Sequence, residues 1–301
     1  MSHPKAPDFF VIGAGRSGTT SLHGYVSQHS QLFLAPKNPS YFYACDLGGS
    51  GFEHDPAALP SYFLSDATRY QPLFAQAPAG TLTGDVSPVY LASTRVAGRI
   101  ARHNPGAKLI TLLRNPVDRV FSHYVARHRD GLEHTPTFEK LVDVETREAI
   151  VRSDANASYL PGGMTSHFLQ PYFDVFPRDQ IVIHFYEDFA TDTGAVMRDL
   201  CRFLGARDDF PFDVSQIHNH GGGRIQNRTL GKVWAASEPL RRGLRPLLPK
   251  KWRDGAFRQV TSRTERVTVR PETRQRLIEL YRGDIAQLKK MTGRNLAAWL
   301  S

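Results

Sequence analysis

The chain has 301 residues, of which 41% are hydrophobic, and it carries a formal net charge of +9. This length and hydrophobic content exclude a largely disordered chain and can build a sizeable core in one α/β domain. The positive charge favours anionic ligands. It is too small to argue for nucleic acid as a partner.

The first eight residues lack the pattern of a signal peptide, and they lead directly into an apolar strand. No apolar run approaches the roughly eighteen residues that span a bilayer. The two cysteines, Cys45 and Cys201, give no disulfide framework. We therefore expect a cytoplasmic protein without a transmembrane segment, and a homo-oligomer is left open.

A predicted strand over 8–14 runs into a glycine-rich turn, and hydroxyl residues then open a helix predicted over 18–29. Backbone N–H groups at such a helix start converge on an anion. The spacing of Gly13, Gly15 and Gly18 fits a dinucleotide fingerprint. That site needs a carboxylate about 20 residues further on to hold the ribose. The first carboxylate after the turn is Asp46, so this interpretation is weak.

The same turn also fits a phosphate-binding P-loop, Gly13-x-x-x-x-Gly18-Thr19-Thr20, in which Thr19 replaces the lysine. That lysine reaches the β- and γ-phosphates of a nucleoside triphosphate. The cation of this turn is Arg16, upstream of Gly18. A loop without the lysine suits a shorter and less charged 5′ end than a triphosphate, such as a 5′-phosphosulfate.

Further predicted strands alternate with helices along the chain. The strands lie at 81–87, 108–114 and 180–186, and the helices at 94–103, 116–130, 163–176, 192–204 and 271–291. Segment 43–80 lacks periodicity and is expected to form loops and short helices. The alternation predicts an α/β, P-loop-like three-layer fold with a central parallel sheet flanked by helices. We expect a single domain over 1–301, with a lid or acceptor-binding region around 205–260.

A second anion motif follows the apolar strand at 108–114. Arg114 closes the strand, Asn115 is a good N-cap, and Pro116 suits the first helical position. Ser122 falls outside the apolar stripe of the helix, so it can face a ligand beside Arg114. The pair predicts a second phosphate clamp.

Three motifs in this order resemble the sulfotransferase family that uses 3′-phosphoadenosine 5′-phosphosulfate (PAPS). They are Gly-Arg-Ser-Gly-Thr-Thr-Ser-Leu22, Gly84-Asp-Val-Ser-Pro-Val-Tyr-Leu91, and Leu-Arg-Asn-Pro-Val-Asp-Arg-Val-Phe-Ser-His-Tyr124. The similarity is greatest to the heparan-sulfate-type and bacterial branch, and it extends over residues 8–204. The closing run Leu296–Leu300 resembles the tail of bacterial members.

The resemblance implies which residues hold PAPS and its product, adenosine 3′,5′-bisphosphate (PAP). The 5′-phosphosulfate would be held by Arg16, Ser17, Gly18, Thr19, Thr20 and Ser21, and the 3′-phosphate by Arg114 and Ser122. Arg16 would also stabilise charge on the bridging oxygen. Gly222, Gly223 and Arg224 resemble a loop that closes over the cofactor, although a glycine linker explains them equally well. No metal is expected, because cationic side chains and helix amides can replace it.

The acceptor side departs from the family pattern. Lys37, Asn38, Tyr41 and Phe42 are expected to bind the acceptor, but Asn38 stands where relatives carry a glutamate base. Asp85 is the substitute catalytic candidate, and a structural carboxylate is the equal alternative. Val86 replaces a lysine of the family, and His218 is a further candidate for the base.

The predicted function is in-line transfer of a sulfuryl group from PAPS to a hydroxyl or amine of a small-molecule or glycan acceptor. A P-loop kinase or NTPase with an atypical loop, or a non-catalytic nucleotide-binding protein, is the alternative. The identity of the acceptor and the role of the basic segment 241–258 are left open.

Overall fold

The structure is a computed structural model that describes residues 6–35, 40–44, 64, 66–129, 132–148, 159–215, 224–225, 264–265 and 268–301. The chain divides into two compact units. The first unit comprises Met1–Arg119, Met164–Asn219 and Tyr281–Ser301, and the second comprises Val120–Gly163 and His220–Leu280. The single domain with a lid over 205–260 stays a prediction.

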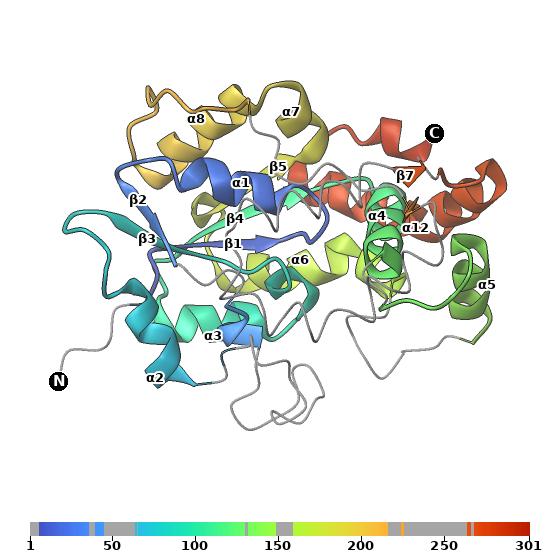
Figure 1. Cartoon of the computed structure of the whole chain (residues 1–301), viewed down its shortest axis with the longest axis horizontal. Coiled ribbons are helices and arrows are strands. Elements are labelled where there is room, and N and C mark those ends of the chain that lie inside the picture. The colour runs from blue at the N-terminus through green and yellow to red at the C-terminus, as the bar shows by residue number, and fades with distance from the viewer. Residues whose placement is uncertain are drawn as a thin grey trace. The chain divides into compact units, whose positions relative to one another are not determined.

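The first unit is built on a five-stranded parallel sheet with the strand order β2-β3-β1-β4-β5 (Figure 1). Its strands are β1 (Phe9–Gly13), β2 (Leu32–Leu34), β3 (Leu82–Val86), β4 (Lys108–Leu113) and β5 (Ile181–Phe185). In the register, Phe9 of β1 lies opposite Gly84 of β3 and Lys108 of β4. The four predicted strands and the parallel sheet are confirmed.

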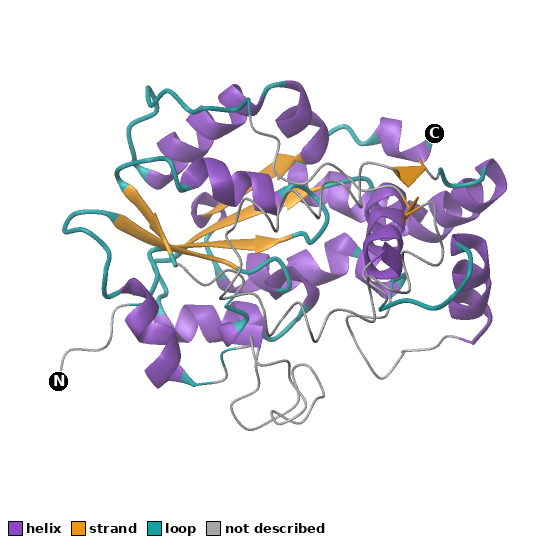
Figure 2. Ribbon diagram, in the orientation of Figure 1, coloured by secondary structure: helices purple, strands orange, loops and turns teal. Residues whose placement is uncertain are grey.

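Helices cover both faces of this sheet, with α1 and α8 on one side and α3 on the other (Figure 1). The α-helices of the first unit are α1 (Thr19–Val26), α2 (Ala67–Tyr70), α3 (Val96–His103), α6 (Thr165–Val175), α7 (Tyr186–Thr191) and α8 (Thr193–Leu204). Its short 3₁₀ turns are η1 (Phe42–Ala44), η3 (Gln71–Phe74), η4 (Tyr90–Ala92), η6 (Arg178–Gln180) and η7 (Ala297–Leu300). The predicted three-layer α/β fold is confirmed (Figure 2).

Two long helices pass through both units, namely α4 (Pro116–Arg129) and α12 (Pro271–Thr292). The second unit also contains α5 (Phe138–Glu148), η5 (Pro161–Gly163) and the antiparallel pair β6 (Arg224–Ile225) and β7 (Thr264–Glu265). Among the helices that the structure describes, none has the length and apolarity needed to cross a membrane.

The main core lies between the sheet and helices α1, α7 and α8. Val11 and Leu112 from the strands pack in one cluster with Leu22 of α1 and Leu200 of α8. Strands β1 and β4 are almost completely buried, as their continuous apolar runs predicted. Cys201 of α8 is also fully buried, and burial raises the pKa of its thiol to about 11. Because Leu22 lies in the first turn of α1, this turn packs on the apolar core.

Candidate functional site

The turn after β1 is shaped by two glycines. A Cβ atom on Gly13 would lie 2.6 Å from Cβ of Leu91, so only glycine fits there without a shift of the backbone. Gly18 has φ of 95° and forms the N-cap of α1. A Cβ atom on Gly15, by contrast, would meet no atom of the described residues within 4 Å. Leu91 therefore packs closely against the turn at Gly13, whereas the space next to Gly15 is open.

Ser17 lies in this turn with a completely buried side chain, and its Oγ has no hydrogen-bond partner among the described residues. A buried polar group without a partner costs about 1–3 kcal/mol. The first intrahelical bond of α1 runs from N–H of Leu22 to the carbonyl of Gly18 (3.0 Å), and the first turn carries no acidic residue. A buried hydroxyl and a helix N-terminus thus meet where an anion would satisfy both.

Arg114 joins the second motif to this turn. Its guanidinium donates a hydrogen bond to the carbonyl oxygen of Arg16 (3.2 Å) and lies over the ring of Tyr186, 4.5 Å from the ring centroid. Asn115 acts as the predicted cap, because its Oδ1 accepts the N–H of Val117 (2.9 Å). The hydrogen bond from Arg114 therefore joins the strand end of the second motif to the turn of the first motif.

Several predicted site residues lie in the second unit or outside the described residues. Ser122 lies on the part of α4 that belongs to the second unit, so its pairing with Arg114 stays a prediction. Arg224 lies on β6. Lys37, Asn38, His218, Gly222 and Gly223 fall outside the described residues.

Asp85 lies at the end of β3 with only 1% of its surface exposed. Four hydroxyl groups donate to its carboxylate: those of Ser40, Tyr70 and Tyr90 (2.8 Å each) and that of Ser87 (2.9 Å). Burial raises the pKa of Asp85, and the four hydrogen bonds oppose this effect. This geometry supports the structural role that the sequence left open and gives the role of catalytic base no support.

The neighbouring candidates for the acceptor side are also packed into the protein. The ring of Phe42 is 4% exposed and stacks on Tyr70, with 4.1 Å between ring centroids. Tyr41 is partly exposed and has φ of 57°. Val86 is 3% exposed, so the position of the family's lysine faces the core here. Packing thus accounts for Phe42 without an acceptor.

The sequence does not predict Ser40 and Tyr70 as partners of Asp85. Ser87 and Tyr90 belong to the Gly84–Leu91 motif, in which hydroxyl residues two and five positions after the carboxylate are the available signal. Tyr70 lies in the segment without periodicity, where no such signal exists. Among the described residues, no group of three His, Cys, Asp or Glu side chains is placed to hold a metal ion.

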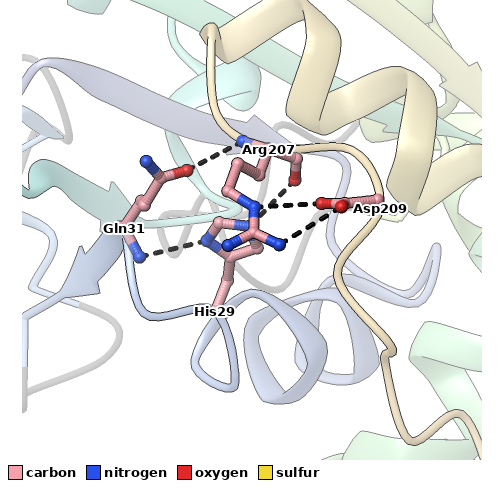
Figure 3. A network of polar contacts seen from close by, with 4 residues as sticks. All are labelled: His29, Gln31, Arg207 and Asp209. Carbon is pink, nitrogen blue, oxygen red and sulfur yellow. Dashed lines mark hydrogen bonds and ion pairs between the residues drawn. The ribbon is translucent and has the colours of Figure 1, made fainter.

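A separate polar network fixes the other end of α1 (Figure 3). N–H of Gln31 donates to Nδ1 of His29 (3.1 Å), so Nε2 carries the hydrogen and donates to the carbonyl of Arg207 (3.0 Å). The side-chain Oε1 of Gln31 accepts the backbone N–H of Arg207 (2.8 Å). Arg207 also pairs with Asp209 at the surface. The turn after α1 and the segment after α8 are thereby held together.

Several known sulfotransferases are similar to this chain. Bifunctional heparan sulfate N-deacetylase/N-sulfotransferase 2 from Homo sapiens is 28% identical over 207 residues, which are 67% of this chain and 22% of that protein. Heparan sulfate glucosamine 3-O-sulfotransferase 3B1 from Mus musculus is 22% identical, over 67% of this chain and 46% of that protein. The chain thus spans about a fifth to a half of the length of these relatives.

A solved structure matches the whole chain. The crystal structure of a sulfotransferase from Alicyclobacillus acidocaldarius aligns with a TM-score of 0.74 and 27% identity, over 99% of this chain and 100% of that chain. Residues 7–209 match the model of the sulfotransferase family. Since this match covers more than half of the sequence, the chain belongs to the sulfotransferase family.

Proposed function

We propose that this protein transfers a sulfuryl group from PAPS to a hydroxyl or amine of a small-molecule or glycan acceptor. The observation that carries the proposal is the hydrogen bond from Arg114 to the carbonyl of Arg16. It brings a strand-end arginine to a turn that holds a buried hydroxyl without a partner. A nucleotide with anionic groups at both its 5′ and 3′ positions suits such a pair of sites.

The residues present fit this cofactor. Ser17 would donate its hydroxyl hydrogen to the 5′ end, together with N–H groups at the start of α1. The open space above Gly15 leaves room for the group to approach the backbone. Arg114 would bind the 3′-phosphate with Ser122, while Gly222, Gly223 and Arg224 would cover the nucleotide.

PAPS, when bound, supplies the sulfuryl group. Arg16 would balance the negative charge that develops on the leaving side, and the first turn of α1 would orient the group for in-line attack. Lys37, Asn38, Tyr41 and Phe42 would face the acceptor. Because Asn38 takes no proton, a phenol or an amine with a lowered pKa needs the least help here. We also propose that the reaction needs no metal ion and that the protein is cytoplasmic.

The test is turnover of PAPS with a panel of phenols, aliphatic alcohols and amines, in which release of PAP is measured. We expect PAP release that depends on the acceptor and persists in the presence of EDTA. Hydrolysis of ATP that requires magnesium would favour the kinase or NTPase alternative. Binding of PAP without turnover of any acceptor would favour a non-catalytic nucleotide-binding protein.

A further inference from the structure

The carboxylate of Asp85 joins three separate segments to β3. Its hydrogen-bond donors come from Ser40 before η1, Tyr70 of α2, and Ser87 and Tyr90 at η4. All of these side chains are at most 2% exposed. A carboxylate that organises so many buried hydroxyls affects the geometry of every segment that carries one.

The bonds continue from the hydroxyls to the backbone of residues 40–44. Ser87 Oγ accepts the N–H groups of Ser40 (3.1 Å) and Tyr41 (3.2 Å), and Tyr90 Oη accepts the N–H of Tyr43 (3.2 Å). Each of the four hydroxyls donates to Asp85, so its hydrogen points toward the carboxylate. The hydroxyl oxygens of Ser87 and Tyr90 can then accept the backbone N–H groups. Asp85 thereby sets the direction of both layers of hydrogen bonds.

The same cluster touches the strand that leads to the anion site. N–H of Ser87 donates to the carbonyl of Val11 in β1 (3.1 Å). The ring of Tyr43 packs edge-on against Phe10 of β1, with 5.3 Å between ring centroids. Residues 40–44 are thus held against β1, whose end forms the anion-binding turn.

We propose that Asp85 is a positioning residue for sulfuryl transfer, which holds residues 40–44 against β1, and that it is not the proton acceptor. The inference rests on the proposed function, because Ser40 directly follows the segment with Lys37 and Asn38 that we assign to the acceptor. Asp85 acts on the reaction through this backbone. It does not touch the reacting atoms.

The test compares Asp85→Asn with Asp85→Ala. Asparagine can present its oxygen to Ser40, Tyr70 and Tyr90 and so keeps three of the four hydrogen bonds, whereas alanine keeps none. Ser40→Ala and Tyr70→Phe each remove only one donor. They provide the same test if Asp85→Ala fails to fold. Asp8→Asn is the matched control, since Asp8 accepts two bonds from Thr83 elsewhere on β3 (2.7 and 2.8 Å).

Three quantities are measured: hydrogen exchange of peptide 40–44, the Kd of PAP, and the pH profile of kcat with the fastest acceptor of the panel. Asp85→Ala should raise the exchange rate at 40–44 and lower kcat, each by about tenfold or more, the effect of roughly one lost hydrogen bond. The Kd of PAP should stay within about threefold. Asp85→Asn should lose less than Asp85→Ala and keep the wild-type pH profile. Asp8→Asn should leave exchange at 40–44 unchanged.

Two results would overturn the inference. One is unchanged exchange at 40–44 in Asp85→Ala. The other is an Asp85→Asn variant that is as inactive as Asp85→Ala, retains protection at 40–44 and loses the acidic limb of the profile, which would make Asp85 the base. If the wild type binds no PAP, the proposed function fails, while the exchange data still judge the structural part of the inference.

Discussion

Arg114 donates a hydrogen bond to the carbonyl oxygen of Arg16, although the two residues are 98 positions apart in the chain. The bond ties the end of β4 to the turn after β1, and the two strands are neighbours in the sheet. In open α/β sheets, ligands bind beyond the carboxyl ends of the strands. The bond thereby places Arg114 beside the turn that carries the first anion motif.

Ser17→Ala should separate folding from binding. The change removes a buried hydroxyl that has no partner in the part of the chain that the structure describes. The free energy of unfolding without ligand should therefore stay unchanged or rise by about 1 kcal/mol. PAP affinity should fall by about tenfold, because one hydrogen bond to the anion is lost. Urea unfolding and calorimetry measure the two effects.

Thr111→Val is the matched control for Ser17→Ala. Thr111 also carries a completely buried hydroxyl without a partner. It alternates along β4 with Leu112, whose side chain packs near Gly18, so it faces the other side of the sheet. This variant should keep the wild-type affinity for PAP. Equal loss of affinity in both variants would count against a specific role of Ser17.

Gly13→Ala and Gly15→Ala should differ in stability. The Cβ atom of an alanine at position 13 would lie 2.6 Å from Cβ of Leu91, so the turn must shift. The Cβ atom of an alanine at position 15 would have no atom of the described residues within 4 Å. We expect Gly13→Ala to lower the melting temperature and weaken PAP binding. Gly15→Ala should keep the melting temperature but weaken binding, because its methyl group fills the space for the anion. Thermal unfolding with and without PAP is the measurement, and equal melting temperatures for the two variants would contradict it.

His29→Ala should destabilise the protein without touching the anion site. It leaves the N–H of Gln31 and the carbonyl of Arg207 without His29 as their partner. Both residues are exposed, so water offsets part of the roughly 1–3 kcal/mol that a buried group would cost. Asp209→Asn is the control, since it removes only the exposed ion pair with Arg207 and should hardly change the urea midpoint. Similar midpoints for the two variants would show that the hydrogen bonds of His29 contribute nothing.

Asp85 should make stability depend on pH in a defined direction. Burial raises its pKa, so the folded state takes up a proton at higher pH than the unfolded state does. The contribution of Asp85 to stability is therefore greatest in acid and falls as pH rises from about 3.9, the usual aspartate value, through the raised pKa. Asp85→Asn lacks this titration. The wild-type free energy of unfolding minus that of Asp85→Asn should decrease over this window, and an increase would indicate a lowered pKa instead.

The sequence predicted the parts of the fold that have strong local patterns. The apolar runs at β1 and β4 and the cap at Asn115 are local signals, and the structure confirms them. Strand β2 escaped prediction because three residues, Leu32–Leu34, show no usable period. Helices α5 and α7 were also missed.

The surroundings of Asp85 could not be predicted, for a different reason. Its four donors lie up to 45 positions away in the chain, and Ser40 and Tyr70 belong to stretches without periodicity. Their meeting depends on tertiary packing at the ends of parallel strands. The sequence could therefore name a carboxylate near the acceptor side but could not distinguish a base from a structural group.

The most direct test of the account is calorimetry with PAP and with adenosine 5′-monophosphate, which lacks the 3′-phosphate. Wild type should bind PAP more tightly. Arg114→Ala should lose about tenfold or more in PAP affinity and most of the preference for PAP, because a charged hydrogen bond disappears. Arg178→Ala is the control, since Arg178 also donates to a backbone carbonyl, that of Ile181, and lies over an aromatic ring. Undiminished PAP binding by Arg114→Ala, or no binding by the wild type, would contradict the account.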